Sequence, residues 1–221
     1  MTRHGRKSYR IPNLVIAGRV ALAFVAVALL GVSSARARGV GVALTVLVIA
    51  MDGLDGFVAR RLELASELGS VLDITADRIV EHLFWISFAV AHQVGLWVPL
   101  VVMTRSFLVD AVRGMALARG RTAFGEATMM RSPVTRFLAS SRLMRTTYGA
   151  AKVAAFVFLG LSMTMAASGG GPAAPTYLDA AAGLSVVIAV ALCLVRGVPV
   201  VVEGRAYLAG PLSPTGGQGP A

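Results

Sequence analysis

Four aspartates with regular spacing lie in or beside long apolar segments of this chain. They fall within a stretch that reads DGLDGFVARRLELASELGSVLDITAD, and they are Asp52, Asp55, Asp73 and Asp77. An ionised carboxylate inside a membrane segment costs ~2.5 to 3.5 kcal/mol on insertion scales. Four of them therefore need a compensating charge or a functional reason to be there.

Helical geometry sorts these aspartates into two pairs. On helices, Asp52 and Asp55 share a face at i, i+3, and Asp73 and Asp77 share a face at i, i+4. Two such pairs facing each other would form an oxygen-rich pocket for hard divalent cations, Mg²⁺ or Mn²⁺. Two dications would neutralise the four charges, so we expect two ions.

Small residues and an arginine accompany the carboxylates. Gly53, Gly56, Ala59 and Gly69 remove side-chain bulk where a nucleotide or a second helix could approach closely. Arg60 adds a guanidinium suited to phosphate. The complete spacing is D-x2-D-G-x2-A-R-x8-G-x3-D-x3-D.

This spacing resembles the signature of the CDP-alcohol phosphatidyltransferases. Every fixed position of the signature is filled, by Asp52, Asp55, Gly56, Ala59, Arg60, Gly69, Asp73 and Asp77. The resemblance implies transfer of a phosphatidyl or similar group from a CDP-linked lipid donor to the hydroxyl of a small polar alcohol, with release of CMP. It also implies a homodimer, because dimers are usual among similar proteins.

The resemblance assigns roles to individual residues. Asp77 is implied to be the general base that takes the proton from the attacking hydroxyl. The metal ligands are implied to be Asp52, Asp55, Asp73 and Asp77. The residues implied to bind the CDP donor are Asp55, Gly56, Ala59, Arg60, Gly69 and Asp73.

Two other interpretations of the aspartates were weighed. Intramembrane carboxylates also line ion or proton paths, so a cation-coupled transporter is the alternative from a different class. Aspartates that cap helix ends would explain one or two of the four, but not the spacing with its glycines and arginine. Release of CMP from a CDP-lipid would rule out the transporter.

Composition indicates the fold class. The chain has 221 residues, of which 56% are hydrophobic and 14% charged, and its mean hydropathy is +0.74, as in integral membrane proteins. Continuous apolar runs of this length predict spanning helices, so we expect an all-α bundle of six transmembrane helices. The runs are 14–32, 40–59, 71–94, 96–116, 148–167 and 178–202.

The distribution of basic residues predicts the orientation. Arginine and lysine gather before the first run, after the second and after the fourth, which places both termini in the cytoplasm of a multi-pass cell-membrane protein. The motif then lies at the cytoplasmic ends of the second and third helices. The net charge of +10 is explained by the arginines of these flanks, which also attract anionic lipid. No basic module for nucleic acid is present.

The predicted organisation is one membrane domain, 1–205, followed by a flexible tail, 206–221, rich in glycine and proline. The single Cys193 excludes an intrachain disulfide. Small residues near Ala35 allow a signal peptide as an alternative for the first run. Against it, the run contains Arg19, and Asn13 and Arg19 resemble the start of the first helix in the family. These two residues lie either near the nucleotide or in structural positions, as a helix cap and a snorkelling arginine.

Arginines give the only indication of the acceptor alcohol. Arg105 and Arg113 lie about two turns apart on the fourth predicted helix, and Arg142 and Arg145 precede the fifth. They would suit a phosphorylated acceptor, and we favour glycerol 3-phosphate over inositol phosphate or another alcohol. Phosphatidylglycerophosphate synthases are the subfamily most resembled, although Ser106 stands where they usually carry an acidic residue.

Three further charged residues are candidates for supporting roles. Glu81 continues the stripe of Asp73 and Asp77 by one turn and could orient a ligand. Lys152 in the fifth predicted helix and Arg196 in the sixth could contribute to an anion site. For Arg142, Arg145 and Arg196, anchoring at the membrane interface is the competing explanation.

Overall fold

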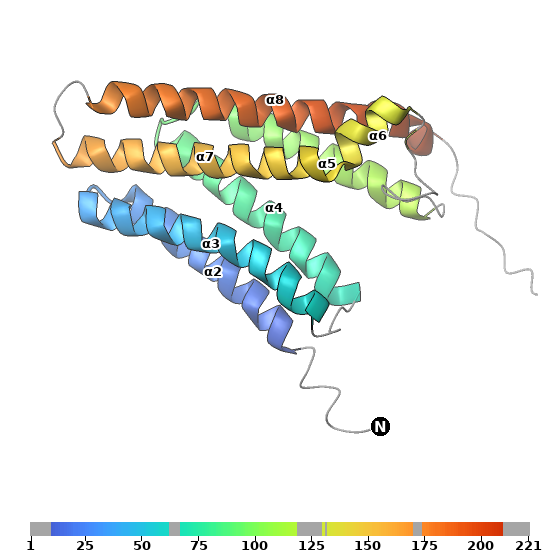
Figure 1. The fold of residues 1–221 in the computed structure, drawn as a ribbon, viewed down its shortest axis with the longest axis horizontal. Helices are drawn as coiled ribbons and strands as arrows, with labels where there is room; N and C mark the ends of the chain where they lie inside the picture. Colours follow the sequence, from blue (N-terminus) through green and yellow to red (C-terminus); the bar gives the residue numbers. More distant parts are fainter. Residues whose placement is uncertain (1–9, 62–66, 119–129, 131, 170–173, 210–221) are drawn as a thin grey trace, which may run out of the picture. The chain divides into compact units, whose positions relative to one another are not determined.

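The computed structural model describes residues 10–61, 67–118, 130, 132–169 and 174–209, and all regular structure in these ranges is helical (Figure 1). The all-α class is therefore confirmed. Each of the six predicted apolar runs coincides with one long helix, and a short helix, α6, lies before α7. The helices are α2 (Arg10–Gly31), α3 (Ala35–Arg61), α4 (Glu67–Val90), α5 (Trp97–Ala118), α6 (Pro133–Ser140), α7 (Arg142–Ala167) and α8 (Ala174–Ala209).

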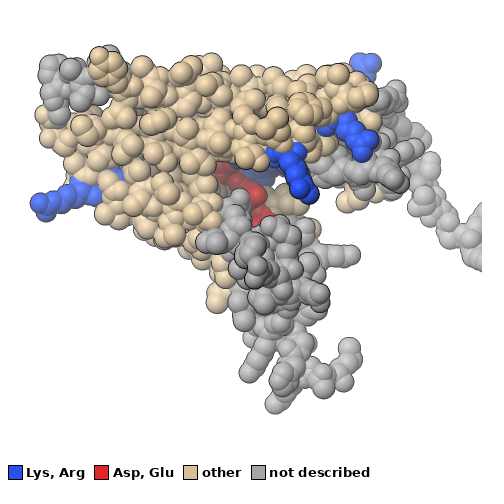
Figure 2. Space-filling view, in the orientation of Figure 1, with Lys and Arg blue, Asp and Glu red and all other residues tan. Residues whose placement is uncertain are grey.

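Three helices in the described part of the chain contain stretches long and apolar enough to cross a membrane. They are Leu14–Gly31, Arg142–Ala167 and Tyr177–Arg205. On the face shown in Figure 2, most of the described surface carries neither basic nor acidic side chains. The chain is thus a multi-pass membrane protein. The expectation that α3, α4 and α5 also span stays a prediction.

The chain divides into two compact units. The first comprises Met1–Met103 and Gly149–Val190, and the second comprises Thr104–Tyr148 and Ala191–Ala221. The helices α5, α7 and α8 each contribute to both. Helix α8 continues to Ala209, four residues into the predicted tail, and residues 210–221 lie outside the described part.

In the first unit, α2 packs against both α3 and α4. Gly41 allows the close approach of α3 to α2, because a Cβ there would lie 3.0 Å from the carbonyl oxygen of Ala26. Gly160 of α7 does the same toward α3, where a Cβ would lie 2.7 Å from Cγ2 of Val42. Small residues at such contacts are typical of membrane helices, whose association depends on close packing.

Aromatic side chains hold α4 against α7 in the same unit. Phe156 of α7 has ring centroids 5.1 Å from Phe84, 4.9 Å from Trp85 and 5.9 Å from Phe88, with Trp85 meeting it edge-on. All four rings are buried. Aromatic contacts of this geometry add stability beyond the buried area, so the cluster fixes the register between the two helices.

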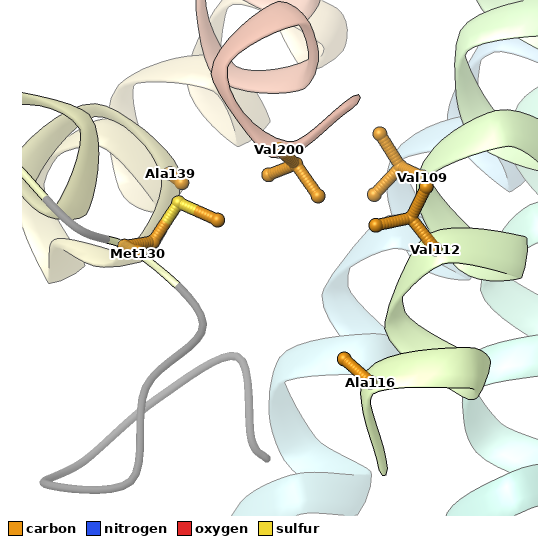
Figure 3. Packing of buried hydrophobic residues seen from close by; sticks show 6 residues of the cluster. All are labelled: Val109, Val112, Ala116, Met130, Ala139 and Val200. Carbon is orange, nitrogen blue, oxygen red and sulfur yellow. The ribbon is translucent and has the colours of Figure 1, made fainter. Parts of the chain in front are cut away.

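The second unit has its own apolar cluster (Figure 3). It joins α5 and α8 to α6 and to residue 130, through Val109, Val112, Ala116, Met130, Ala139 and Val200. Figure 3 shows the three α5 side chains facing Met130 and Ala139, with Val200 extending from α8 toward them. The cluster gives this unit a core that contains none of the motif aspartates.

The short helix α6 is not among the helices predicted from the sequence. Pro133 occupies its first turn, where the missing N–H of proline is not needed. The Ser132 side chain caps the helix by accepting a hydrogen bond from the backbone N–H of Val134 at 3.3 Å. The Thr135 hydroxyl then donates to Oε1 of Glu203 at 2.8 Å and ties α6 to α8.

Candidate active site

Helix α4 presents Asp73 and Asp77 to a single guanidinium from α2. Nη2 of Arg19 donates to Oδ1 of Asp77 at 2.6 Å and lies 3.7 Å from Oδ1 of Asp73. Residues one turn apart on a helix reach the same neighbour in this way. The two carboxylates are therefore brought together, and both side chains stay almost half exposed, at 43% for Asp73 and 47% for Asp77.

The sequence leaves two interpretations of Arg19 open, a position near the nucleotide and a structural position. Arg19 is 1% exposed, so the interpretation as an arginine snorkelling to the membrane surface is wrong. Its charge is buried in the first unit and is compensated by the two motif aspartates. Two indications were present in the sequence, the resemblance of Arg19 to the start of the family's first helix and its position within an apolar run, where a costly charge requires a partner.

The other half of the motif lies on α3. Asp52, Asp55, Gly56, Ala59 and Arg60 have helical backbone there, so the two aspartates have the predicted i, i+3 spacing on a helix. Their side chains lie outside the described residues. Gly69 is in the first turn of α4. Because α2 packs against both α3 and α4, one helix supports both halves of the motif.

A second buried charge network lies one turn further along α4. Glu81 is 3% exposed, and its Oε2 forms an ion pair with Nζ of Lys152 on α7 at 3.2 Å and accepts a hydrogen bond from Nη1 of Arg78 at 3.5 Å. Phe84 and Phe156 are in tilted ring contact one turn beyond this pair on the same two helices. Glu81 and Lys152 are thus joined directly, and Glu81 is held by two cations rather than aimed at Asp77.

The predicted acceptor arginines all belong to the second unit. Arg105 on α5 is buried, Arg113 on the same helix is half-buried, and Arg142 and Arg145 in the first turn of α7 are exposed. Arg196 on α8 lies over the ring of Tyr148, with Cζ 5.3 Å from the ring centroid. Cation–π contacts of this kind hold an arginine in place. The structure thus groups these arginines in one unit and separates buried from exposed members.

The oxygen ligands of the motif suit a hard divalent cation, since Asp73 and Asp77 offer carboxylate oxygens side by side. Among the residues whose side chains are described, no group of three or more His, Cys, Asp or Glu residues could hold a metal ion. The two further ligands predicted, Asp52 and Asp55, lie outside that set. Their roles as metal ligands remain predictions.

Comparison with known families matches residues 9–204 to the CDP-alcohol phosphatidyltransferases. The chain belongs to this family, a class of membrane transferases in phospholipid synthesis whose members use divalent metal ions. The family and the transferase class predicted from the signature are therefore confirmed.

Individual relatives are more distant. A Mycobacterium tuberculosis protein provisionally named a cardiolipin synthase is 36% identical over 115 residues, which are 51% of this chain and 53% of the relative. A CDP-diacylglycerol–glycerol-3-phosphate 3-phosphatidyltransferase of Pseudomonas fluorescens is 30% identical over 118 residues, 52% of this chain and 60% of the relative. Its namesake in Rickettsia bellii is 30% identical over 103 residues, 47% and 57% of the two chains. The chain spans about half the length of the curated relatives it matches.

Proposed function

We propose that this protein transfers a phosphatidyl group from CDP-diacylglycerol or a similar CDP-alcohol to the hydroxyl of a phosphorylated alcohol, and releases CMP. The observation that carries the proposal is the convergence of Asp73 and Asp77, two signature aspartates, on the buried guanidinium of Arg19. An ion pair that served only the fold would not require both carboxylates to be almost half exposed beside the buried Arg19.

The reaction is a displacement at phosphorus. The acceptor hydroxyl oxygen attacks the lipid-bearing phosphorus of the donor's pyrophosphate, a new P–O bond forms, and the P–O bond to CMP breaks. Asp77 accepts the proton from the attacking hydroxyl. Divalent cations held by Asp52, Asp55, Asp73 and Asp77 would neutralise the pyrophosphate and the departing CMP. No nucleophilic serine or cysteine is required.

Arg19 orients the proton acceptor in this mechanism. A hydrogen bond of 2.6 Å from Arg19 to Oδ1 fixes the orientation of the Asp77 carboxylate, which would take the proton from the acceptor hydroxyl. The charge of Arg19 also reduces the repulsion between Asp73 and Asp77 before substrate is bound. Arg19 is therefore a positioning residue in this proposal.

The donor is recognised by the α3 part of the motif. Gly56 and Ala59 would admit the nucleotide without a steric clash, and Arg60 would contact a phosphate. Asp55, Gly69 and Asp73 complete the set that the family signature supplies. The family membership of residues 9–204 supports these proposed roles.

Glycerol 3-phosphate is the acceptor we favour. Arg105, Arg113, Arg142 and Arg145 would bind its phosphate, and relatives named for glycerol 3-phosphate support this choice. Inositol phosphate is the alternative among small phosphorylated alcohols. Mycobacterial relatives are named for cardiolipin synthesis, so the acceptor test also includes phosphatidylglycerol.

The proposed topology has six spans, with both termini and the active site on the cytoplasmic side. The basic segments before the first run and before α7 support this orientation, and Arg142 and Arg145 are exposed as flanking residues would be. A water-soluble CMP product could then leave directly into the cytoplasm. We also propose a homodimer, as the family resemblance implies.

The test is incubation of the purified protein with CDP-diacylglycerol, Mg²⁺ and a panel of acceptors. The panel contains glycerol 3-phosphate, inositol phosphate, phosphatidylglycerol, and non-phosphorylated glycerol and serine. We expect CMP release and a lipid product with the mass of phosphatidylglycerophosphate. Cation-dependent transport without CMP release from any CDP-alcohol would overturn the proposal.

A further inference from the structure

Arg105 is a buried cation without a described counter-charge. It is 7% exposed, and its Nε has no hydrogen-bond partner among the described residues. The next residue, Ser106, is 1% exposed, and its hydroxyl oxygen likewise lacks a partner there. An arginine stays protonated at any physiological pH, so a charge this deep in an apolar helix calls for an anion.

A glycine on α8 makes room for this arginine. A Cβ built on Gly197 would lie 2.4 Å from Nε of Arg105, 2.5 Å from its Cγ and 2.9 Å from its Cδ. Real Cβ atoms do not approach other atoms so closely. The three atoms belong to the middle of the arginine side chain, so it crosses the surface of α8 where Gly197 leaves the backbone bare.

Helix propensity does not explain a glycine at this position. Glycine inside a helix is less favourable than alanine by ~1 kcal/mol, and both residues of the contact are buried. Gly183, on the same helix, has no atom within 4 Å of its hypothetical Cβ. The close contact at Gly197 is thus a property of the site and not of glycines in α8 generally.

We propose that Gly197 is a positioning residue that seats the guanidinium of Arg105 to bind the phosphate monoester of the small alcohol acceptor. The inference rests on the proposed function and deepens it, because it names the backbone position that gives one arginine its place. Phosphate is the shared chemistry, and it could come from the soluble acceptor or from the CDP-lipid. The kinetic test separates these two sources.

The experiment compares Gly197→Ala with the matched control Gly183→Ala and with Arg105→Ala. The Michaelis constants for glycerol 3-phosphate and for CDP-diacylglycerol are measured for each. We expect Gly197→Ala to raise the constant for glycerol 3-phosphate about tenfold, the usual weight of one charged hydrogen bond, and to leave the donor constant and kcat within about twofold. Gly183→Ala should match the wild type.

A double substitution tests whether Gly197 acts through Arg105. If it does, Gly197→Ala adds nothing to the effect of Arg105→Ala, since the displaced side chain is already gone. Additive effects of the two substitutions would overturn the inference. A rise in the donor constant alone would also overturn it, because the phosphate bound by Arg105 would then belong to the CDP-lipid.

Binding without turnover separates this inference from the proposed function. The thermal unfolding midpoint is measured with glycerol 3-phosphate and with glycerol, for the wild type and the three variants. We expect glycerol 3-phosphate alone to raise the midpoint of the wild type and of Gly183→Ala, and to have little effect on Gly197→Ala and Arg105→Ala. This pattern in a protein that released no CMP would refute the proposed reaction and keep the anion site. Equal midpoint shifts in all four proteins would refute the site, whatever the activity.

Discussion

The two units of the molecule treat buried charge in opposite ways. In the first unit, Arg19 pairs with Asp73 and Asp77, and Glu81 pairs with Lys152, so that each buried charge has a partner of opposite sign. In the second unit, the buried Arg105 lies against the bare backbone at Gly197, and no ion pair joins it to a described residue. The buried charges named in the first unit compensate one another, whereas for Arg105 in the second unit we propose an external anion.

This difference favours separate functions for the two units. Carboxylates that share a guanidinium repel each other less, so Asp73 and Asp77 can lie side by side in the ionised form before metal and substrate bind. An arginine without a carboxylate partner keeps its hydrogen-bonding capacity for a phosphate. We therefore propose roles in metal binding, donor binding and proton transfer for the motif residues of the first unit, and a role in phosphate binding for Arg105 of the second.

Removing the metal tests the first unit most severely. In a chelator the four motif carboxylates would leave the donor's pyrophosphate without neutralising charge, so we expect CMP release to disappear. Addition of excess Mg²⁺ to the same sample should restore it. Full turnover by EDTA-treated protein would show that the aspartates do not act through metal ions.

Substitutions at Glu81 and Lys152 test whether charge pairing in the first unit stabilises the fold. Lys152→Met leaves a buried carboxylate short of one of its two cations, and loss of one partner of a buried pair costs ~3 to 5 kcal/mol. Arg78 stays nearby, so we expect destabilisation near the lower value, measured by denaturant titration in detergent. The control is Glu81→Gln combined with Lys152→Met, which removes both charges and should recover most of the loss. A double variant less stable than Lys152→Met would contradict this.

Arg19 and Arg105 test the comparison directly, because both are buried arginines with different proposed partners. Arg19→Gln removes the cation that fixes Asp77, and we expect kcat to fall about 30-fold to 100-fold with little change in the Michaelis constant for glycerol 3-phosphate. Arg105→Ala should do the reverse, raising that constant about tenfold with kcat retained. Identical kinetic profiles for the two variants would remove the distinction between the units.

Much of the fold could be predicted from the sequence because its signals are local. Long apolar runs indicated six helices, and the positions of α2 to α5, α7 and α8 agree with them. Helical periodicity placed Asp73 and Asp77 on one face. The helix α6 was missed because Pro133 is compatible with a turn and with the first turn of a helix, and its cap is a single serine.

The pairing of charges could not be predicted, because it depends on which helices meet. Nothing near Arg19 in the sequence indicates that α2 packs against α4 and brings it to Asp77. The contact between Arg105 and Gly197 joins positions 92 residues apart on two helices. Glu81 lies on the α4 stripe of Asp73 and Asp77, as predicted. Its partner Lys152 lies on α7, and the sequence does not indicate which face of α7 meets α4.

In the proposed mechanism, Asp77 takes the acceptor's proton while Asp52 holds metal. One paired measurement tests this difference most directly. Asp52→Asn and Asp77→Asn are titrated calorimetrically with a CDP-alcohol in the presence of Mg²⁺, and their CMP release is assayed alongside. Asp52→Asn should lose donor affinity and activity together, because the pyrophosphate is held through the ions.

Asp77→Asn keeps the shape of the side chain, and its amide oxygen can still face a metal, but an amide cannot take a proton at neutral pH. Loss of a general base costs ~10² to 10⁴ in rate. We expect near-normal donor affinity for Asp77→Asn, with activity reduced at least about a hundredfold. Donor affinity as low as that of Asp52→Asn would contradict it and identify Asp77 as chiefly a metal ligand.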